Sequence, residues 1–240
     1  MKTIKILFFS IFISFSISNI QTAKAQNIHL FYDFGSVIYE ECKDRAFFTT
    51  TVDLFHRDAW GSTFFFIDMN YADHGITYVY WEINRDFTFP RVPISLSLEY
   101  NGGLTNTFSL SNSYLAGVRY SYDNEGFTKG VSLTCFYKYI QGNVEPHNFQ
   151  ATAIWYLHFA KKKFSFLGFA DFWREPRATI AESDYIFLTE PQIWFNLDAL
   201  SNVSDKLKLS IGSEVKISYN FVLPDRFMVI PTIALKWRFE

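Results

Sequence analysis

The sequence lacks several features that would assign it to a common class of protein. After residue 25 it has no uninterrupted apolar run of about 18 residues, the length that marks a membrane-spanning helix. It has two cysteines, Cys42 in an expected loop and Cys135 in an expected strand, and we expect no structural disulfide. A formal net charge of -2 argues against a strongly basic nucleic-acid-binding protein.

Motifs for catalysis and metal binding are missing as well. The sequence contains no G-x-S-x-G and no H-E-x-x-H, and its 5 histidines do not cluster with other metal ligands. An enzymatic site needs a nucleophile, a base and an orienting group within reach of one another. His158 and Ser165 are close in sequence, which we interpret as chance. We therefore expect no catalytic activity, no metal, no cofactor and no nucleic-acid partner.

The first 25 residues have the three-part layout of a secretory signal peptide. Basic residues at Lys2 and Lys5 precede an apolar run over 6–20, and small residues stand at Ala23 and Ala25. A membrane-anchoring helix is the alternative, but this apolar run is short for the ~20 residues that a spanning helix needs. The sequence predicts cleavage after Ala25 and a single exported domain over residues 26–240. No cysteine stands at the cleavage point, so we expect no lipoprotein.

Aromatic residues are unusually abundant in a chain that is not hydrophobic overall. They make up 20% of the residues, with 28 Phe and 14 Tyr, while the mean hydropathy is only +0.01. A transmembrane β-barrel needs this composition, because its outer wall faces lipid and aromatic girdles mark both rims. Since no long apolar run is present, the apolar residues have to alternate with polar ones.

The alternation is visible in several segments. Residues 94–100 interleave apolar and polar side chains strictly, as do 207–212 and 215–221. In 229–239 the apolar side chains fall on one face, while Lys236 and Arg238 fall on the other. A period of two places alternate side chains on opposite faces of a strand.

We count about twelve such segments and expect an all-β fold, a single antiparallel transmembrane barrel with an even number of strands. The segments span 27–34, 46–57, 62–71, 76–87, 93–101, 113–123, 128–140, 147–159, 163–174, 184–197, 206–221 and 227–239. With both ends periplasmic, short turns are expected near 58–61, 123–126 and 161–163, and longer outer loops over 35–45, 101–112 and 175–183. The connections 71–75 and 222–226 are short for outer loops, and 198–205 is long for a periplasmic turn.

The last strand carries a further signal. Outer-membrane barrels commonly end in an aromatic-rich strand with a terminal Phe, which the barrel-assembly machinery binds during biogenesis. Here Trp237-Arg238-Phe239 is similar to that ending, with Glu240 one residue beyond. The sequence thus predicts localisation in the outer membrane of a Gram-negative cell, with outer-membrane lipid around the barrel.

The alternation assigns a charged and aromatic set to the lumen, because Arg or Lys on the lipid face costs ~2–4 kcal/mol near the midplane. The predicted lumen-lining residues are Asp33, Asp53, Phe64, Phe66, Asp68, Tyr78, Tyr80, Glu82, Glu99, Arg119, Lys138, Asp171, Glu190, Glu214, Lys216, Lys236 and Arg238. The aromatics Phe136, Tyr156 and Trp194 share this phase. Because the last strand closes against the first, we expect Lys236 and Arg238 to approach Asp33.

Two interpretations of this lumen stay open. An acidic wall facing a more basic one would orient a dipolar solute, and aromatic faces beside carboxylates would stack a nucleobase or sugar ring. Alternatively, the charges form salt bridges that hold a narrow barrel shut. A twelve-stranded barrel lies between the ~8 strands that side chains fill and the 16–18 strands that leave an aqueous channel.

A family resemblance supports the barrel. The segments that carry it are 30–35, 49–53, 61–68, 80–83, 99–103, 168–173 and 190–192. Together they resemble an uncharacterised family of bacterial outer-membrane proteins grouped with the Tsx-like nucleoside-specific channels. The resemblance covers the whole mature chain and implies a twelve-stranded, Tsx-like barrel with nucleosides as candidate solutes. It assigns no residue to nucleoside binding.

The sequence favours a narrow channel for small polar solutes. The alternative is a closed structural barrel, or one that binds a ligand or partner through the loops at 101–112 and 175–183. An outer-membrane lipid-modifying enzyme is less favoured, because the required constellation of residues is missing.

Overall fold

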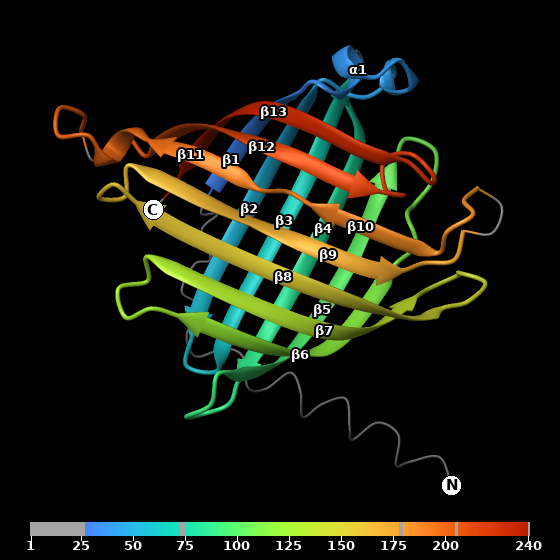
Figure 1. Cartoon of the computed structure of the whole chain (residues 1–240), viewed down its shortest axis with the longest axis horizontal. Coiled ribbons are helices and arrows are strands. Elements are labelled where there is room, and N and C mark those ends of the chain that lie inside the picture. The colour runs from blue at the N-terminus through green and yellow to red at the C-terminus, as the bar shows by residue number, and fades with distance from the viewer. Residues whose placement is uncertain (1–26, 73–74, 178–179, 205, 240) are drawn as a thin grey trace, which may run out of the picture.

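The computed structural model describes residues 27–72, 75–177, 180–204 and 206–239. The expected signal peptide and its cleavage site lie outside the described residues. The described chain forms one closed antiparallel β-barrel (Figure 1). The strands are β1 (Asn27–Asp33), β2 (Phe48–Asp58), β3 (Gly61–Ala72), β4 (Gly75–Thr88), β5 (Ile94–Thr105), β6 (Ser113–Asp123), β7 (Lys129–Ile140), β8 (His147–Phe159), β9 (Phe164–Arg174), β10 (Tyr185–Thr189), β11 (Gln192–Asn196), β12 (Leu209–Tyr219) and β13 (Phe227–Arg238).

Apart from β10 and β11, which do not pair with each other, each strand pairs with its neighbours in the sequence, and β13 pairs with β1 to close the barrel. The pieces β10 and β11 both pair with β9 on one side and β12 on the other, so they act as two halves of one strand. The barrel therefore has 12 strands, as predicted. In Figure 1 the strands from β6 to β12 cross in front of β2 to β5 at a steep angle, because barrel strands are tilted.

The interruption between β10 and β11 falls at Glu190 and Pro191, where the sequence predicted one continuous strand. Proline has no N–H to donate to the ladder, so it is tolerated at irregular positions. The carbonyl of Pro191 still accepts a hydrogen bond of 3.0 Å from the Val215 N–H, so the contact with β12 continues across the break.

Strand β5 extends further than predicted. Asn101, Gly102 and Gly103 pair with β4, although these residues are typical of turns. A Cβ on Gly102 would lie 3.0 Å from the Trp81 ring, so the large aromatic occupies the space that a side chain would take. The loop expected over 101–112 is shorter as a result.

The outer wall of the barrel is apolar. Side chains facing away from the lumen include Leu98, Val118 and Ile233, which are 41%, 57% and 55% exposed. They alternate with buried polar residues such as Ser97, which is fully buried on the opposite face. Among the residues that the structure describes, no helix is long and apolar enough to cross a membrane.

The two ends of the barrel differ. At one end, here the terminal end, β1 begins beside the end of β13, with Asn27 opposite Arg238. The opposite end, here the loop end, carries the β1–β2 loop (residues 34–47) with the short helices α1 (Gly35–Ile38) and η1 (Glu40–Cys42). The third short helix, η2 (Leu197–Ala199), lies in the β11–β12 connection.

The β2–β3 turn depends on a glycine. Gly61 has a φ of 150°, and a Cβ there would lie 2.0 Å from the Asp86 carbonyl oxygen. The Asp58 carboxylate accepts hydrogen bonds from the backbone N–H groups of Trp60 and Gly61, at 2.8 and 3.0 Å. These contacts fix the tight turn that the sequence predicted here.

Candidate functional site: the barrel lumen

The cross-strand register places the predicted lumen residues on one common face. Asp53 pairs with Phe66, Phe66 with Glu82, and the same face continues around the barrel. The opposite face carries the exposed apolar side chains of the wall. The residues on the inner face include Asp33, Asp53, Phe64, Phe66, Asp68, Tyr78, Tyr80, Glu82, Glu99, Arg119, Lys138, Asp171, Glu190, Glu214, Lys216, Lys236 and Arg238.

One group of lumen charges, the first lumen cluster, consists of Glu82, Glu99, Asp171 and Lys138. The carboxylates of Glu82 and Glu99 interact electrostatically with Asp171 from the far side of the barrel and with Lys138. Each carboxylate accepts its hydrogen bond from a neutral donor. The Tyr80 hydroxyl donates to Glu82 at 2.7 Å, and the Thr152 hydroxyl donates to Asp171 at 2.5 Å.

Lys138 does not form an ion pair with these carboxylates. Its ammonium donates a hydrogen bond of 2.8 Å to the Gln150 side-chain oxygen and lies 4.8 Å from the centre of the Trp173 ring. A cation over an indole face is stabilised by the ring quadrupole. The first lumen cluster therefore holds three carboxyl groups and a lysine that forms an ion pair with none of them.

A second lumen cluster consists of Asp68, Glu190, Glu214 and Lys216. Lys216 forms a short ion pair with Glu190, which lies on the inner face because it shares the phase of Leu188 and Gln192 on either side of it. Glu214 accepts a hydrogen bond of 2.7 Å from Gln192, and Asp68 accepts one from Thr51. In this cluster too, one lysine faces three carboxyl groups.

The carboxylates of both clusters are half-buried. Their remaining accessible surface faces the lumen, because the other face of each strand belongs to the outer wall. Trp194, Ile186 and Ile230 have no exposed surface although they share the inner face, so this sector of the interior is packed. The accessible part of the lumen accordingly includes the carboxylates of both clusters.

Two expectations about the lumen charges were wrong. The antiparallel register of β1 and β13 places Lys236 opposite His29 and Asp33 opposite Thr232, so Lys236 does not approach Asp33. Arg238 lies opposite Asn27 and instead binds Asp198 at 2.7 Å. There is also no separate basic wall, since Lys138 and Lys216 each lie among carboxylates.

Near the terminal end, Lys236 lies over an aromatic group. Its ammonium is 4.2 Å from the centre of the Trp194 ring, and His29 and Phe31 pack against the same indole. His29 Nε2 lies 2.6 Å from the Asp53 carboxylate, which also accepts a hydrogen bond of 2.6 Å from Asn27. The sequence analysis did not single out His29, although it shares the inward phase of Asp33 on the first strand.

The predicted lumen aromatics divide into two sets. Phe66 contacts Phe64 and Tyr80, with ring centroids 5.9 and 6.0 Å apart, and all three are half-buried. Phe136 and Trp194 are 3% and 0% exposed, so they pack the interior and offer no face to a solute. The first set lies beside the Glu82 carboxylate, and a further predicted aromatic, Tyr156, donates a hydrogen bond of 2.7 Å to the Asp123 carboxylate.

Arg45 is a lumen residue that sequence reasoning missed, since it falls in a loop. Its Nε donates to the Asp33 carboxylate at 2.8 Å at the loop end. Cys42 is buried beside it, and this burial raises the pKa of the thiol above its ordinary value. Cys42 and Cys135 are both free thiols.

His158 and Ser165, whose closeness we attributed to chance, do bind one another. His158 Nδ1 lies 2.8 Å from the Ser165 hydroxyl, which also accepts a hydrogen bond of 2.8 Å from the Asn196 amide. Asn196 in turn accepts a hydrogen bond from Ser210. Ser165 is 4% exposed, so a substrate has no access to the hydroxyl, and the group links β8, β9, β11 and β12 near the terminal end.

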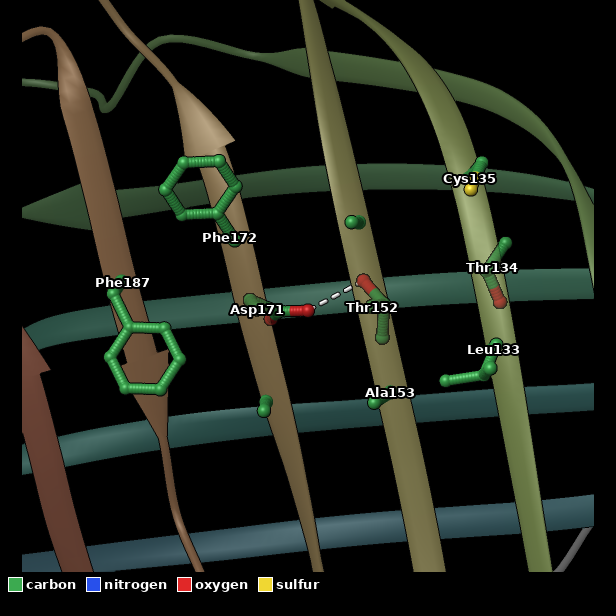
Figure 2. Close-up of a pocket in the computed structure, with 10 residues that line it drawn as sticks. Leu133, Thr134, Cys135, Thr152, Ala153, Asp171, Phe172 and Phe187 are labelled. Atoms are coloured by element: carbon green, nitrogen blue, oxygen red, sulfur yellow. Dashed lines mark hydrogen bonds between the residues drawn. The ribbon is translucent and has the colours of Figure 1, made fainter.

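A hollow of about 260 Å³ lies elsewhere, on the outer wall (Figure 2). Its lining includes the small side chains of Cys135, Ala151 and Ala153 and the rings of Phe172 and Phe187. Asp171 of the first lumen cluster and its hydrogen-bond partner Thr152 also line the hollow, between these outward-facing side chains. No group of metal-ligating side chains occurs among the described residues.

Fold and lumen together define the class: a closed twelve-stranded transmembrane β-barrel with charged side chains on its inner face. The chain belongs to the DUF5020 family, a domain of unknown function whose family model matches residues 25–239. No curated protein matches the chain.

Solved structures share the architecture at low sequence identity. The NanC porin in a rhombohedral crystal form has a TM-score of 0.58 at 10% identity, and the KdgM porin has 0.52 at 11%. The KdgM porin in complex with disordered oligogalacturonate has a TM-score of 0.50 at 12% identity. Each match covers 90% of this chain and 100% of the other. This likeness concerns the fold, and the relationship to Tsx-like channels stays a prediction.

Proposed function

We propose that the protein is an outer-membrane channel for small polar solutes and that it favours solutes carrying a positive charge. One observation carries this proposal: the lumen carboxylates outnumber the lumen cations, and most of them have no cationic partner. Asp68, Glu82, Glu99, Asp171 and Glu214 form no ion pair within 4.0 Å with any residue that the structure describes.

Charge of one sign inside a narrow, low-dielectric wall focuses the electric field and raises the local concentration of counter-ions. A cation entering this lumen gains the attraction of both clusters, whereas an anion is repelled by them. Because the carboxylates bind mainly neutral hydroxyl and amide groups, their charge acts on the solute. A lumen of this kind supports selective passage of cations and dipolar molecules.

The carboxylates of the lumen also argue against a polyanion as the solute of this protein. One of them is described in complex with oligogalacturonate, which is a polyanion. The lumen of the present protein disfavours a polyanion, so we propose a different cargo. Nucleosides remain candidates through the resemblance to Tsx-like channels, since Phe66 and Tyr80 offer ring faces beside Glu82.

We further propose that the protein is exported and inserted with its terminal end in the periplasm. The basic and apolar segments of residues 1–25 support export. The aromatic end of β13 supports insertion by the barrel-assembly machinery. N-terminal sequencing of protein from isolated outer membranes tests both steps, with Gln26 expected as the first residue.

The decisive experiment measures the reversal potential of the purified protein in planar bilayers under a KCl gradient, together with solute flux into liposomes. We expect K⁺ to permeate faster than Cl⁻. The double variant Glu82→Gln/Glu99→Gln should lower this preference, and Glu125→Gln, in the exposed β6–β7 turn, is the matched control. A folded wild type without ion conductance or solute flux contradicts the proposal.

One observation favours the alternative of a closed structural or partner-binding barrel. Arg119 of β6 and Asp86 of β4 form an ion pair of 2.5 Å with 13% and 6% exposed side chains, so part of the interior is bridged. In a closed barrel, Arg119→Ala would open conductance where the wild type has none. In a channel, the same variant changes an existing conductance.

A further inference from the structure

The β1–β2 loop is held firmly against the loop end of the barrel. The Phe34 N–H donates to the Pro231 carbonyl at 3.2 Å, and the Tyr39 hydroxyl donates to the Val229 carbonyl at 3.2 Å. Arg226 binds Glu41 at 3.0 Å from the β12–β13 connection. The two hydrogen bonds to β13 tie the loop to one side of the entrance and fix where its side chains point, whereas the Arg226–Glu41 pair is exposed to solvent.

Arg45 is the side chain that this loop brings to the entrance. Its Nε binds Asp33 on the inner face of β1, and its side chain is 28% exposed. Arg45 also interacts electrostatically with Tyr78 and Lys216, which lie on the inner faces of β4 and β12. The guanidinium thus lies at the loop-end entrance, next to the second lumen cluster.

The packing around Gly35 keeps the arginine in this position. A Cβ on Gly35 would lie 2.8 Å from the Asp33 carboxylate oxygen, 3.0 Å from Cδ of Arg45 and 3.2 Å from Ile230. A larger residue would therefore displace the Arg45 side chain from its place against Asp33. The Asp33 carboxylate is further fixed by a hydrogen bond of 2.7 Å from the Gly35 N–H.

The donors of Arg45 are only partly used. Its Nε donates to Asp33, but neither of its Nη groups donates a hydrogen bond to any residue of the described chain. A guanidinium binds a carboxylate through two parallel hydrogen bonds from its planar fork, and it stays charged at any physiological pH. An accessible Arg with free Nη groups is therefore suited to bind a carboxylate from solution.

We propose that Arg45 is the binding point for the carboxylate of an incoming solute and that the channel takes zwitterions of the amino-acid type. The inference rests on the proposed channel function and specifies its substrate class. A zwitterion interacts favourably with both sites, because its carboxylate binds Arg45 at the entrance and its ammonium is attracted by the carboxylates of the second lumen cluster. A simple cation is attracted by the clusters but repelled by Arg45.

The test compares glycine with ethanolamine, which replaces the carboxylate by a hydroxyl, in liposome flux assays. Arg45→Gln should lower glycine entry relative to ethanolamine, and it should raise the K⁺ to Cl⁻ permeability ratio by about two- to fourfold. This range follows from the effect of a unit charge at ~10 Å in water. Arg226→Gln removes the same charge from the exposed pair with Glu41 and should change neither quantity.

Arg45→Lys provides a second, independent variant, which keeps the charge but loses the fork. It should keep the ion selectivity and lose much of the preference for glycine. A conducting wild type whose selectivity is unchanged in both Arg45 variants overturns the inference and leaves the channel intact. A wild type that carries neither ions nor solutes overturns the channel function, and the inference with it.

Discussion

Arg119 binds Asp86 across an intervening strand: Nη1 of Arg119 in β6 lies 2.5 Å from Oδ2 of Asp86 in β4, above β5. Arg119 also donates to the Thr134 hydroxyl of β7 at 2.9 Å. The pair therefore links strands that are not neighbours in the sheet. Since the backbone ladder connects only adjacent strands, side chains of this kind resist deformation of the barrel cross-section.

Arg119→Ala should destabilise the barrel by about 2–3 kcal/mol. Breaking a fully buried ion pair costs ~3–5 kcal/mol, and the cost is lower here because water reaches part of the lumen. The loss arises from leaving the Asp86 carboxylate buried without its cation. Urea unfolding in lipid vesicles measures it. Arg226→Ala, which breaks the exposed pair with Glu41, is the control and should cost about 0–1 kcal/mol. Equal effects of the two variants would contradict this assignment.

Val118→Arg should destabilise the protein in a lipid bilayer by about 2–4 kcal/mol, the cost of a basic residue on the lipid face near the midplane. Val118 is 57% exposed on the outer wall of β6. Val144→Arg is the matched control, since Val144 lies in the β7–β8 connection and is 95% exposed. If both changes were tolerated equally, the outer wall would not face lipid.

The two thiols should react differently with maleimides. Cys135 lies on the outer wall, so in liposomes an uncharged, lipid-soluble maleimide should modify it and a charged one should not. Cys42 should react with neither reagent, because it is 6% exposed and burial raises the pKa of its thiol, which lowers the reactive thiolate fraction. Mass spectrometry before and after urea unfolding gives the readout. Rapid labelling of Cys135 by the charged reagent would argue for a water-soluble barrel.

Lys216→Gln should raise the K⁺ to Cl⁻ permeability ratio, because it removes the one cation of the second lumen cluster and leaves Glu190 without its ion pair. Lys206→Gln, at an exposed position in the β11–β12 connection, should not change the ratio. Reversal potentials under a salt gradient measure both. A fall in cation preference for Lys216→Gln would contradict the assignment of the cluster to the conduction path.

The alternation of apolar and polar residues was sufficient to predict the barrel and nearly all of its strands. A period of two is a local property that the sequence displays directly, as in 94–100 and 229–239. The break at Pro191 and the extension of β5 through Gly102 were not predictable in this way. Both depend on contacts with neighbouring strands, which compensate for residues that are unfavourable in a regular ladder.

The contacts between charged side chains in the lumen could be predicted less well from the sequence. The inner face of each strand follows from its phase, but the pairing of charges depends on the register between strands. For this reason Lys236 was expected near Asp33, whereas the register places it opposite His29. Arg45 carries no periodic signal, and its position depends on how the β1–β2 loop folds back over the barrel.

The closure of the barrel by β1 and β13 has a consequence for how the protein folds. The two strands that complete it are separated by nearly the whole chain, with Asn27 opposite Arg238. Contacts between residues so far apart in sequence form late, because the loop entropy must be lost before they stabilise anything. β1, at 7 residues, is also shorter than β13. We therefore expect the seam to be the last part to form and the first to open, so its amides should exchange with solvent sooner than those of β6 to β8.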